Sequence, residues 1–160
     1  MWRSSRRWEH GRNRDGLALK NSTTIRVRYA DTDAMKVVNN GKYFEYFEVG
    51  RSELLRSLGL PYSEIEKQGI FVAVVEAFAK YRKSARYDDL ITIEASISEA
   101  PVARIRIQYR IFAEGETEPI VEGYTVHSFL NEATGRPTRA PAMFAQTLQE
   151  AMNKARGNNA

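Results

Sequence analysis

The chain has 160 residues, of which 42% are hydrophobic and 28% are charged, so it can build one domain with a core of its own. It has no cysteine and two histidines, His10 and His127, which excludes a disulfide framework, a cysteine nucleophile, a thiolate zinc site and a histidine metal cluster. No apolar run approaches the roughly 20 residues of a membrane-spanning helix, and no apolar stretch typical of a secretory signal is present. We therefore expect a cytoplasmic protein with no membrane span, no metal and no cofactor.

The positive charge of the chain is concentrated at its start. Residues 1–20 carry six basic and two acidic side chains, an excess equal to the formal net charge of +4 of the whole chain. The rest of the chain is therefore neutral, whereas a nucleic-acid-binding domain carries positive charge on its folded surface. We predict no nucleic-acid partner, unless the first 20 residues supply the binding. Their lack of apolar periodicity predicts a disordered arm at 1–20 before a single domain at 21–156.

The first predicted elements are a strand and a long helix. From residue 23 apolar and polar residues alternate, which predicts a half-buried strand. After a polar bend at 30–36, apolar residues at three- and four-residue steps predict a helix at about 40–58, for which Asn39 or Asn40 can cap the first N–H groups. Gly50 falls on the apolar stripe of this helix, which predicts that another backbone approaches closely there.

The second half of the chain is predicted to consist of strands followed by a closing helix. Alternating patterns predict strands at about 71–82, 91–98, 104–111 and 120–130, and helical spacing predicts a last helix at 141–156. The apolar start of the strand at 71–82 predicts that its first half is covered on both faces. Consecutive strands with short connections pair antiparallel, and a helix with one apolar stripe packs on one face of such a sheet. The predicted fold class is α+β.

The bend before the long helix holds two carboxylates, Asp31 and Asp33. Free backbone N–H groups and the positive end of the helix dipole meet at a helix N-terminus, which suits an oxyanion or a polarised carbonyl. A carboxylate one short loop away can attack such a carbonyl or activate a water molecule. The alternative is that these residues only shape the turn or cap the helix.

The segment Tyr29-Ala-Asp-Thr-Asp33, followed by Val37-Val38-Asn39-Asn40-Gly-Lys-Tyr43 and Phe47-Glu48, resembles the signature of the 4-hydroxybenzoyl-CoA thioesterase family. The resemblance covers about residues 23–140. It implies a hotdog fold, in which an antiparallel five-stranded sheet wraps around one long central helix, and hydrolysis of acyl-CoA thioesters to free acid and CoA. It also implies that Asp33 is the catalytic nucleophile or general base, that the Asn40 N–H polarises the thioester carbonyl, and that Asp31 is structural.

Two departures from the family pattern bear on the substrate. Family members often have Gly where Lys36 stands, and His or an aromatic residue where Asn39 and Asn40 stand. Lys36 either favours the ionised form of Asp33, meets an anionic substrate group or points into solvent. Because the role of Asn40 uses its backbone, the changed side chain leaves the predicted chemistry intact and the preferred acyl group open.

The stretch from Val38 to Tyr43 also resembles acyl-carrier-protein thioesterases, a related hotdog group. In that group an Asn and a His follow the aspartate at two and four positions, where this chain has Met35 and Val37. The chemistry of that group is therefore not supported, but acyl carrier protein stays an alternative carrier of the acyl group. A third alternative is a non-catalytic hotdog domain that binds acyl-CoA or a protein partner.

Further candidate residues lie outside the bend. By the resemblance, the nucleotide end of CoA lies along basic surface at a subunit boundary, and the candidates for this contact are Lys80, Arg82, Lys83 and Arg86. The alternative for this cluster is an edge strand protected by charges. Tyr43 and Glu48 are candidates for the substrate pocket, with an exposed helix position as the alternative for Glu48, and His127 is expected to be structural. Edge-to-edge pairing of sheets in the relatives implies a homodimer or homotetramer.

Overall fold

The computed structural model describes residues 18–158, which form one antiparallel sheet with helices. The strands are β1 (Leu19–Arg26), β2 (Ile70–Tyr81), β3 (Leu90–Ile97), β4 (Arg104–Ala113), β5 (Val121–Asn131) and β6 (Pro137–Thr138). The helices are the 3-10 turn η1 (Tyr29–Asp31) and the α-helices α1 (Lys42–Ser57), α2 (Tyr62–Glu66) and α3 (Ala142–Gly157). The predicted order of the long elements is therefore confirmed.

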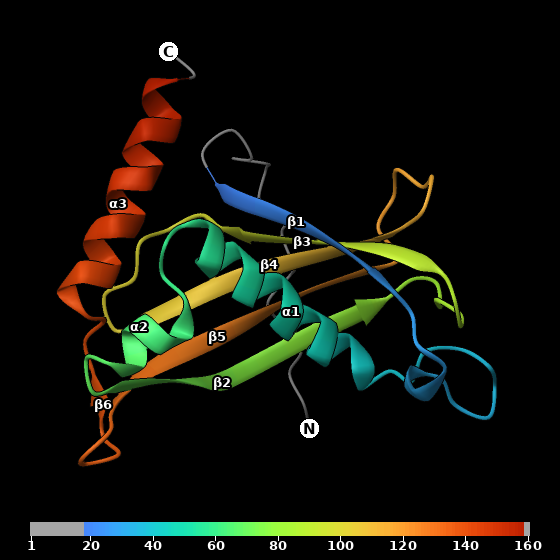
Figure 1. Cartoon of the computed structure of the whole chain (residues 1–160), viewed down its shortest axis with the longest axis horizontal. Coiled ribbons are helices and arrows are strands. Elements are labelled where there is room, and N and C mark those ends of the chain that lie inside the picture. Colours follow the sequence, from blue (N-terminus) through green and yellow to red (C-terminus); the bar gives the residue numbers. More distant parts are fainter. Residues whose placement is uncertain (1–17, 159–160) are drawn as a thin grey trace, which may run out of the picture.

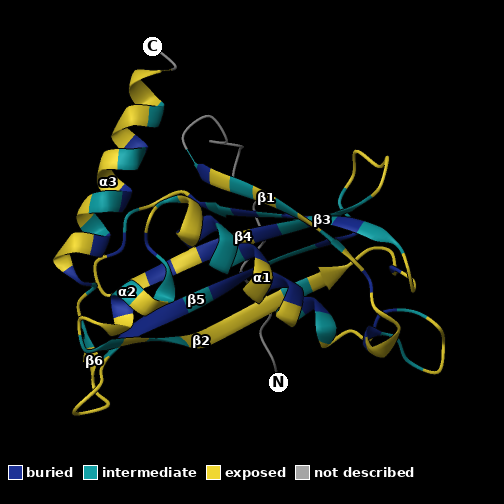
Figure 2. Cartoon of the chain, viewed as in Figure 1, coloured by how far each residue is buried: buried dark blue, intermediate teal, exposed yellow. Residues whose placement is uncertain are grey.

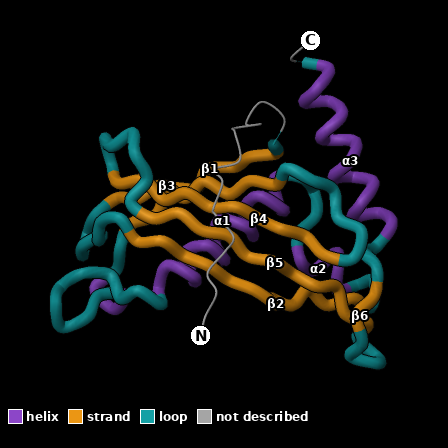
Figure 3. Tube along the Cα trace, turned by 180° about the vertical axis from the view of Figure 1, so that it is seen from behind, coloured by secondary structure: helices purple, strands orange, loops and turns teal. Residues whose placement is uncertain are grey.

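The five long strands lie in the order β1-β3-β4-β5-β2, and β6 pairs with β5 beside this path. Every pairing between these strands is antiparallel. α1 crosses one face of the sheet, and the view from behind shows the sheet in front of that helix (Figures 1 and 3). The prediction of an antiparallel sheet with one long helix on one of its faces is confirmed.

The core lies between α1 and the inner face of the sheet. Along β3 and β4 every second residue is buried, because successive side chains of a strand point to opposite faces. α1 buries one stripe against them, and the ring of Phe47 stacks on that of Tyr109 with centroids 4.3 Å apart. The buried side chains of β3 and β4 and the apolar stripe of α1 thus form one apolar layer, which fixes α1 on the sheet.

Two glycines allow α1 and the sheet to approach closely. A Cβ atom on Gly50 would lie 2.6 Å from Cγ2 of Ile93, so the neighbour is a side chain of β3 and not the backbone that the sequence predicted. A Cβ atom on Gly123 of β5 would meet the carbonyl oxygen of Phe78 and would lie 2.8 Å from the ring of Phe47. Both positions therefore exclude a larger side chain without rearrangement.

The domain starts earlier than the sequence predicted. β1 begins at Leu19, which is buried and pairs with Ile97, so residues 19 and 20 belong to the sheet and not to the predicted arm. Asn21 and Ser22 also pair with β3. Because these polar residues interrupt the apolar alternation, the sequence pattern did not predict that the strand begins before residue 23. The rest of the predicted arm, residues 1–17, lies outside the described residues.

β2 is an edge strand of the described sheet and is exposed along much of its length (Figure 2). Phe71, Val74 and Val75 are 44%, 49% and 50% exposed, so the prediction that both faces of this half are covered is wrong for the single chain. The reason is that β2 pairs only with β5, while α1 packs mainly over β1 and β3. No helix in the described part of the chain is long and apolar enough to cross a membrane.

Candidate active site

The loop between η1 and α1 is a short two-stranded structure. An isolated bridge joins Thr32 to Val38, and the Asn39 N–H donates to the Asp31 carbonyl oxygen at 2.9 Å. A second bridge, between Val37 and Arg86, attaches the loop to the segment that follows β2. These backbone bonds hold the whole stretch in one conformation before the helix begins.

Asp33 stands at the tip of this loop, where its carboxylate is oriented by the backbone. The Met35 N–H donates to Asp33 Oδ1 at 2.8 Å, and the Lys36 N–H donates to the Asp33 carbonyl oxygen at 2.9 Å. Within residues 18–158, Oδ2 of Asp33 has no hydrogen-bond partner. The loop therefore presents one carboxylate oxygen of Asp33 that can accept a proton or attack an electrophile.

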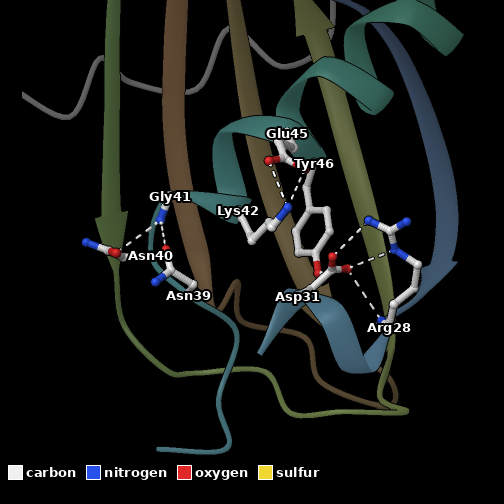
Figure 4. A network of polar contacts seen from close by, with 8 residues as sticks. All are labelled: Arg28, Asp31, Asn39, Asn40, Gly41, Lys42, Glu45 and Tyr46. Carbon is white, nitrogen blue, oxygen red and sulfur yellow. Dashed lines mark hydrogen bonds and ion pairs between the residues drawn. The ribbon is translucent and has the colours of Figure 1, made fainter. Parts of the chain in front are cut away.

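The N–H groups at the start of α1 are not equally available. The Gly41 N–H donates to the side-chain oxygens of Asn39 and Asn40, at 2.9 and 3.1 Å, as Figure 4 shows. The N-cap residue of α1 is Gly41, without a side-chain cap, so the prediction that Asn39 or Asn40 is the cap is wrong by one or two positions. The Lys42 N–H donates to the Asn39 carbonyl oxygen at 2.9 Å. The Asn40 N–H makes no hydrogen bond within the described part of the chain. Asn40 lies one residue before the N-cap Gly41, so this donor is near the positive end of the helix and is available to an oxyanion.

Asp31 is used inside the fold. Its side chain is 2% exposed and accepts from the Tyr46 hydroxyl at 2.9 Å and from Nη2 of Arg28 at 2.9 Å (Figure 4). Burial alone would raise the pKa of Asp31, but the bonds from Arg28 and Tyr46 outweigh it, so the pKa is lowered. Burial and the same carboxylate raise the pKa of Tyr46. The two aspartates of the motif thus differ sharply in their surroundings.

Two tyrosines flank the start of the helix. Tyr43 is 2% exposed, and its hydroxyl accepts from the Ala85 N–H at 3.1 Å, so this pocket candidate lies in the core and supports the loop. Tyr81, the last residue of β2, donates from its hydroxyl to the Asn40 carbonyl oxygen at 2.9 Å. The two rings are 5.4 Å apart. Tyr43 and Tyr81 therefore connect the helix start to β2 and the loop after it.

Glu48 lies on the outer side of α1, away from the sheet. It lines an open depression of about 420 Å³ together with Glu45, Val49, Ser52 and Glu53. Its carboxylate is 4.0 Å from the Arg51 guanidinium and remains largely exposed. The depression lies along the middle of α1, so the structure does not bring Glu48 together with Asp33.

The four basic candidates do not form one free cluster. Arg82 is bound to Glu122 at 2.7 Å, and Lys83 to Glu116 at 3.0 Å. Lys80 pairs with Glu122 across the two strands. The side chain of the next residue, Tyr81, reaches Asn40. Because successive side chains of a strand point to opposite faces, Lys80 points to the outer face of the sheet. Arg86 lies beside the loop, because its backbone bridges Val37. Of the four, Arg86 is the one that is bridged to the loop that carries Asp33.

Other groups of the described chain lie apart from this loop. His127 is 1% exposed, and its Nε2 is 2.8 Å from the Thr125 hydroxyl, in the core between β5 and α1. Residues 18–158 contain no group of three or more acidic or histidine side chains placed to bind a metal. The chemistry of the candidate site therefore depends on Asp33 and on the backbone of the helix start.

Sequence reasoning did not identify Tyr81 or Tyr46 as part of the site. Tyr46 was visible as a helix residue, but nothing in the pattern joined it to Asp31 fifteen positions earlier. Tyr81 contacts Asn40 across 41 positions, and this contact depends on how β2 pairs with β5. The only sequence signal for a role of Tyr81 is its position at the end of a predicted apolar strand.

The antiparallel sheet with one long helix on its face agrees with the predicted hotdog fold. The chain belongs to the thioesterase-like superfamily, whose family model matches residues 27–148. The predictions of a hotdog fold, of the thioesterase family and of the thioester-hydrolase class are confirmed.

Named relatives and solved structures are similar over most of the domain. The chain resembles the DHNA-CoA thioesterase of Staphylococcus aureus, with a TM-score of 0.77, 32% identity and coverage of 88% of this chain and 93% of that one. It is 32% identical to the chloroplastic acyl-acyl carrier protein thioesterase ATL3 of Arabidopsis thaliana over 127 residues, which are 79% of this chain and 66% of that protein. It is 35% identical to the acyl-CoA thioesterase YbgC of Haemophilus influenzae over 91 residues, 56% of this chain and 67% of that protein.

Proposed function

We propose that this protein hydrolyses acyl-CoA thioesters to a free acid and CoA, with Asp33 and the Asn40 N–H as the catalytic groups. The observation that carries the proposal is the pairing of these two groups on one loop. Asp33 has a carboxylate oxygen without a partner in the described chain, and Asn40 has the N–H that the helix start leaves unused. The relatives named above as acyl-CoA thioesterases support the same substrate class.

The chemistry follows from this arrangement. The thioester carbonyl accepts a hydrogen bond from the Asn40 N–H, and the positive end of α1 stabilises the negative charge that develops on its oxygen. The Asp33 carboxylate attacks the carbonyl carbon, or takes a proton from a water molecule that does so. The bond to sulfur then breaks, and the CoA thiolate leaves and takes up a proton. After direct attack, the acyl group stays on Asp33 as a mixed anhydride, and water breaks the bond between the acyl carbon and the Asp33 oxygen to give the free acid. In the other route, the activated water itself supplies the hydroxyl of the acid.

The test is thiol release from acetyl-CoA, hexanoyl-CoA, palmitoyl-CoA and benzoyl-CoA by the full chain and by Asp33→Asn. We expect kcat to fall by about 10²–10⁴-fold in the variant, because the carboxylate is lost while its shape is kept. Asp88→Asn is the matched control, since Asp88 is exposed and has a φ of 68°, which asparagine tolerates. Equal turnover by Asp33→Asn and the parent protein would show that the catalytic residue is another one.

Acyl carrier protein is a second candidate for the carrier of the acyl group. The observation in its favour is the 32% identity over 79% of this chain to a protein named as an acyl-acyl carrier protein thioesterase. Hydrolysis rates for the same acyl group on CoA and on acyl carrier protein separate the two. Tight binding of acyl-CoA without release of thiol on either carrier would instead support a non-catalytic binding domain.

We also propose that two copies of the chain pair through β2. Within the described sheet the outer edge of this strand has no partner, and its apolar side chains are about half exposed. Such an edge is a template for pairing with another strand. Light scattering is expected to give a mass of two or four times 18.3 kDa for the parent protein and a smaller mass for Val75→Lys. Val102→Lys, at a site that is 65% exposed and away from β2, should leave the mass unchanged.

A further inference from the structure

The hydroxyl of Tyr81 is bound to the peptide that follows the proposed oxyanion donor. Tyr81 ends β2 and pairs there with Val121, and its side chain reaches across to the turn before α1. The hydroxyl donates to the Asn40 carbonyl oxygen at 2.9 Å. This bond joins the edge strand of the sheet to the residue whose N–H is proposed to polarise the substrate.

The two peptide groups on either side of Asn40 are each held by separate partners. The peptide before Asn40 is held because its carbonyl oxygen, on Asn39, accepts from the Lys42 N–H at 2.9 Å. The peptide after Asn40 is held by Tyr81 at its oxygen and by the Asn39 and Asn40 side chains at the Gly41 N–H. With both peptide planes held, the two soft dihedrals of Asn40 are restricted and the direction of its N–H is set.

From this geometry we infer that Tyr81 is a positioning residue for the proposed hydrolysis, acting through the backbone of Asn40. The inference rests on the proposed function, since it concerns the donor to the thioester carbonyl. Preorganised donors stabilise a developing oxyanion without reorganisation during the reaction, so a donor that moves loses part of this effect. Tyr81 thus contributes to the rate although it need not touch the substrate.

The surroundings of Tyr81 separate the role of its hydroxyl from that of its ring. The ring packs against Tyr43, which is itself fixed in the core by its bond to the Ala85 N–H. Tyr81 is 43% exposed, and partial burial raises its pKa, so the phenol stays protonated and donates throughout the neutral range. A phenylalanine at this position keeps the ring contact and removes only the donor to Asn40.

The first test is Tyr81→Phe, measured with the acyl-CoA of the four-member panel that the parent protein hydrolyses fastest. We expect kcat to fall roughly 3- to 30-fold, less than the ~10²–10³-fold of losing an oxyanion donor outright, with KM unchanged. Tyr87→Phe is the control, because Tyr87 is exposed and its hydroxyl has no partner among residues 18–158. The melting temperatures of both variants should match that of the parent protein.

The second test measures the backbone of Asn40 without turnover. In the parent protein its ¹⁵N order parameter should be near the rigid value of ~0.85, and in Tyr81→Phe it should fall, while Tyr87→Phe leaves it unchanged. An unchanged order parameter, an unchanged kcat, or a raised KM with the same kcat in Tyr81→Phe overturns the inference and leaves the proposed function in place. If the parent protein releases no thiol, both the inference and the proposed function are wrong. The inactivity of the parent protein distinguishes this outcome from failure of the inference alone.

Discussion

Lys36 has a strained backbone conformation, at a position where the family resemblance implies glycine. Its φ is 62°, in the left-handed region, where a side chain places Cβ too close to the following carbonyl oxygen. The turn at this point is closed by the bond from the Lys36 N–H to the Asp33 carbonyl oxygen. A glycine at this position, as the family resemblance implies, would therefore fit the backbone of the loop that holds Asp33.

We predict that Lys36→Gly stabilises the protein by about 0.5–1 kcal/mol, because relief of about 1–2 kcal/mol of left-handed strain is partly offset by the entropy of glycine. The expected rise in melting temperature is about 1–4 °C. Lys36→Ala retains Cβ and should change it by no more than about 1 °C. Equal rises in both variants would show that the lysine charge, and not the backbone, is responsible.

Much of the element scale could be predicted from the sequence. The long helix was predicted at about 40–58 and lies at Lys42–Ser57, because its apolar stripe is a local signal. The bend with Asp33 and Asn40 was recognisable for the same reason. What could not be predicted depends on register: Arg82 is neutralised by Glu122, forty residues away, because β2 pairs with β5. The bond from Tyr81 to Asn40 depends on the same pairing.

The docking of α1 on the sheet depends on Gly123. We predict that Gly123→Ala lowers the free energy of unfolding by about 3 kcal/mol, the upper part of the usual range for overpacking, because the nearest atom is a backbone oxygen that cannot turn away. The melting temperature should fall by about 6–12 °C in thermal unfolding followed by circular dichroism. Gly157→Ala, where no atom lies within 4 Å, is the control. A shift below 2 °C for Gly123→Ala would mean that β2 and α1 move apart easily.

At the scale of the whole molecule, two sets of polar side-chain contacts join α1 to α2 and β4 to β5. Arg51 of α1 donates from Nε to the Tyr62 hydroxyl of α2 at 3.1 Å. The Tyr109 hydroxyl of β4 is 2.6 Å from that of Thr125, which is 2.8 Å from Nε2 of His127 in β5. Burial raises the pKa of Tyr109 to about 12. A neutral His127 ring can accept a hydrogen bond from the Thr125 hydroxyl, whereas a protonated ring can only donate one to it.

The charge state of His127 therefore makes the stability of the whole fold depend on pH. Burial, together with the positive charge of Arg51, lowers the pKa of His127 from 6.5 to about 4. Between these values the unfolded chain binds a proton that the folded chain does not, so stability is complete above about pH 6.5 and falls as the pH drops toward 4. The full loss is roughly 3 kcal/mol, at 1.36 kcal/mol for each pKa unit.

The measurement that checks this effect is the melting temperature between pH 4.5 and 7.5 for the parent protein and for His127→Gln. Carboxylates titrate in both proteins, so the difference between the two curves isolates His127. We expect the parent protein to lose about 4–10 °C more than the variant on going from pH 7 to pH 4.5, from roughly 2–3 kcal/mol of proton linkage. Parallel curves would mean that His127 keeps an ordinary pKa in the folded protein, and that these side-chain contacts tolerate a charged ring beside Arg51.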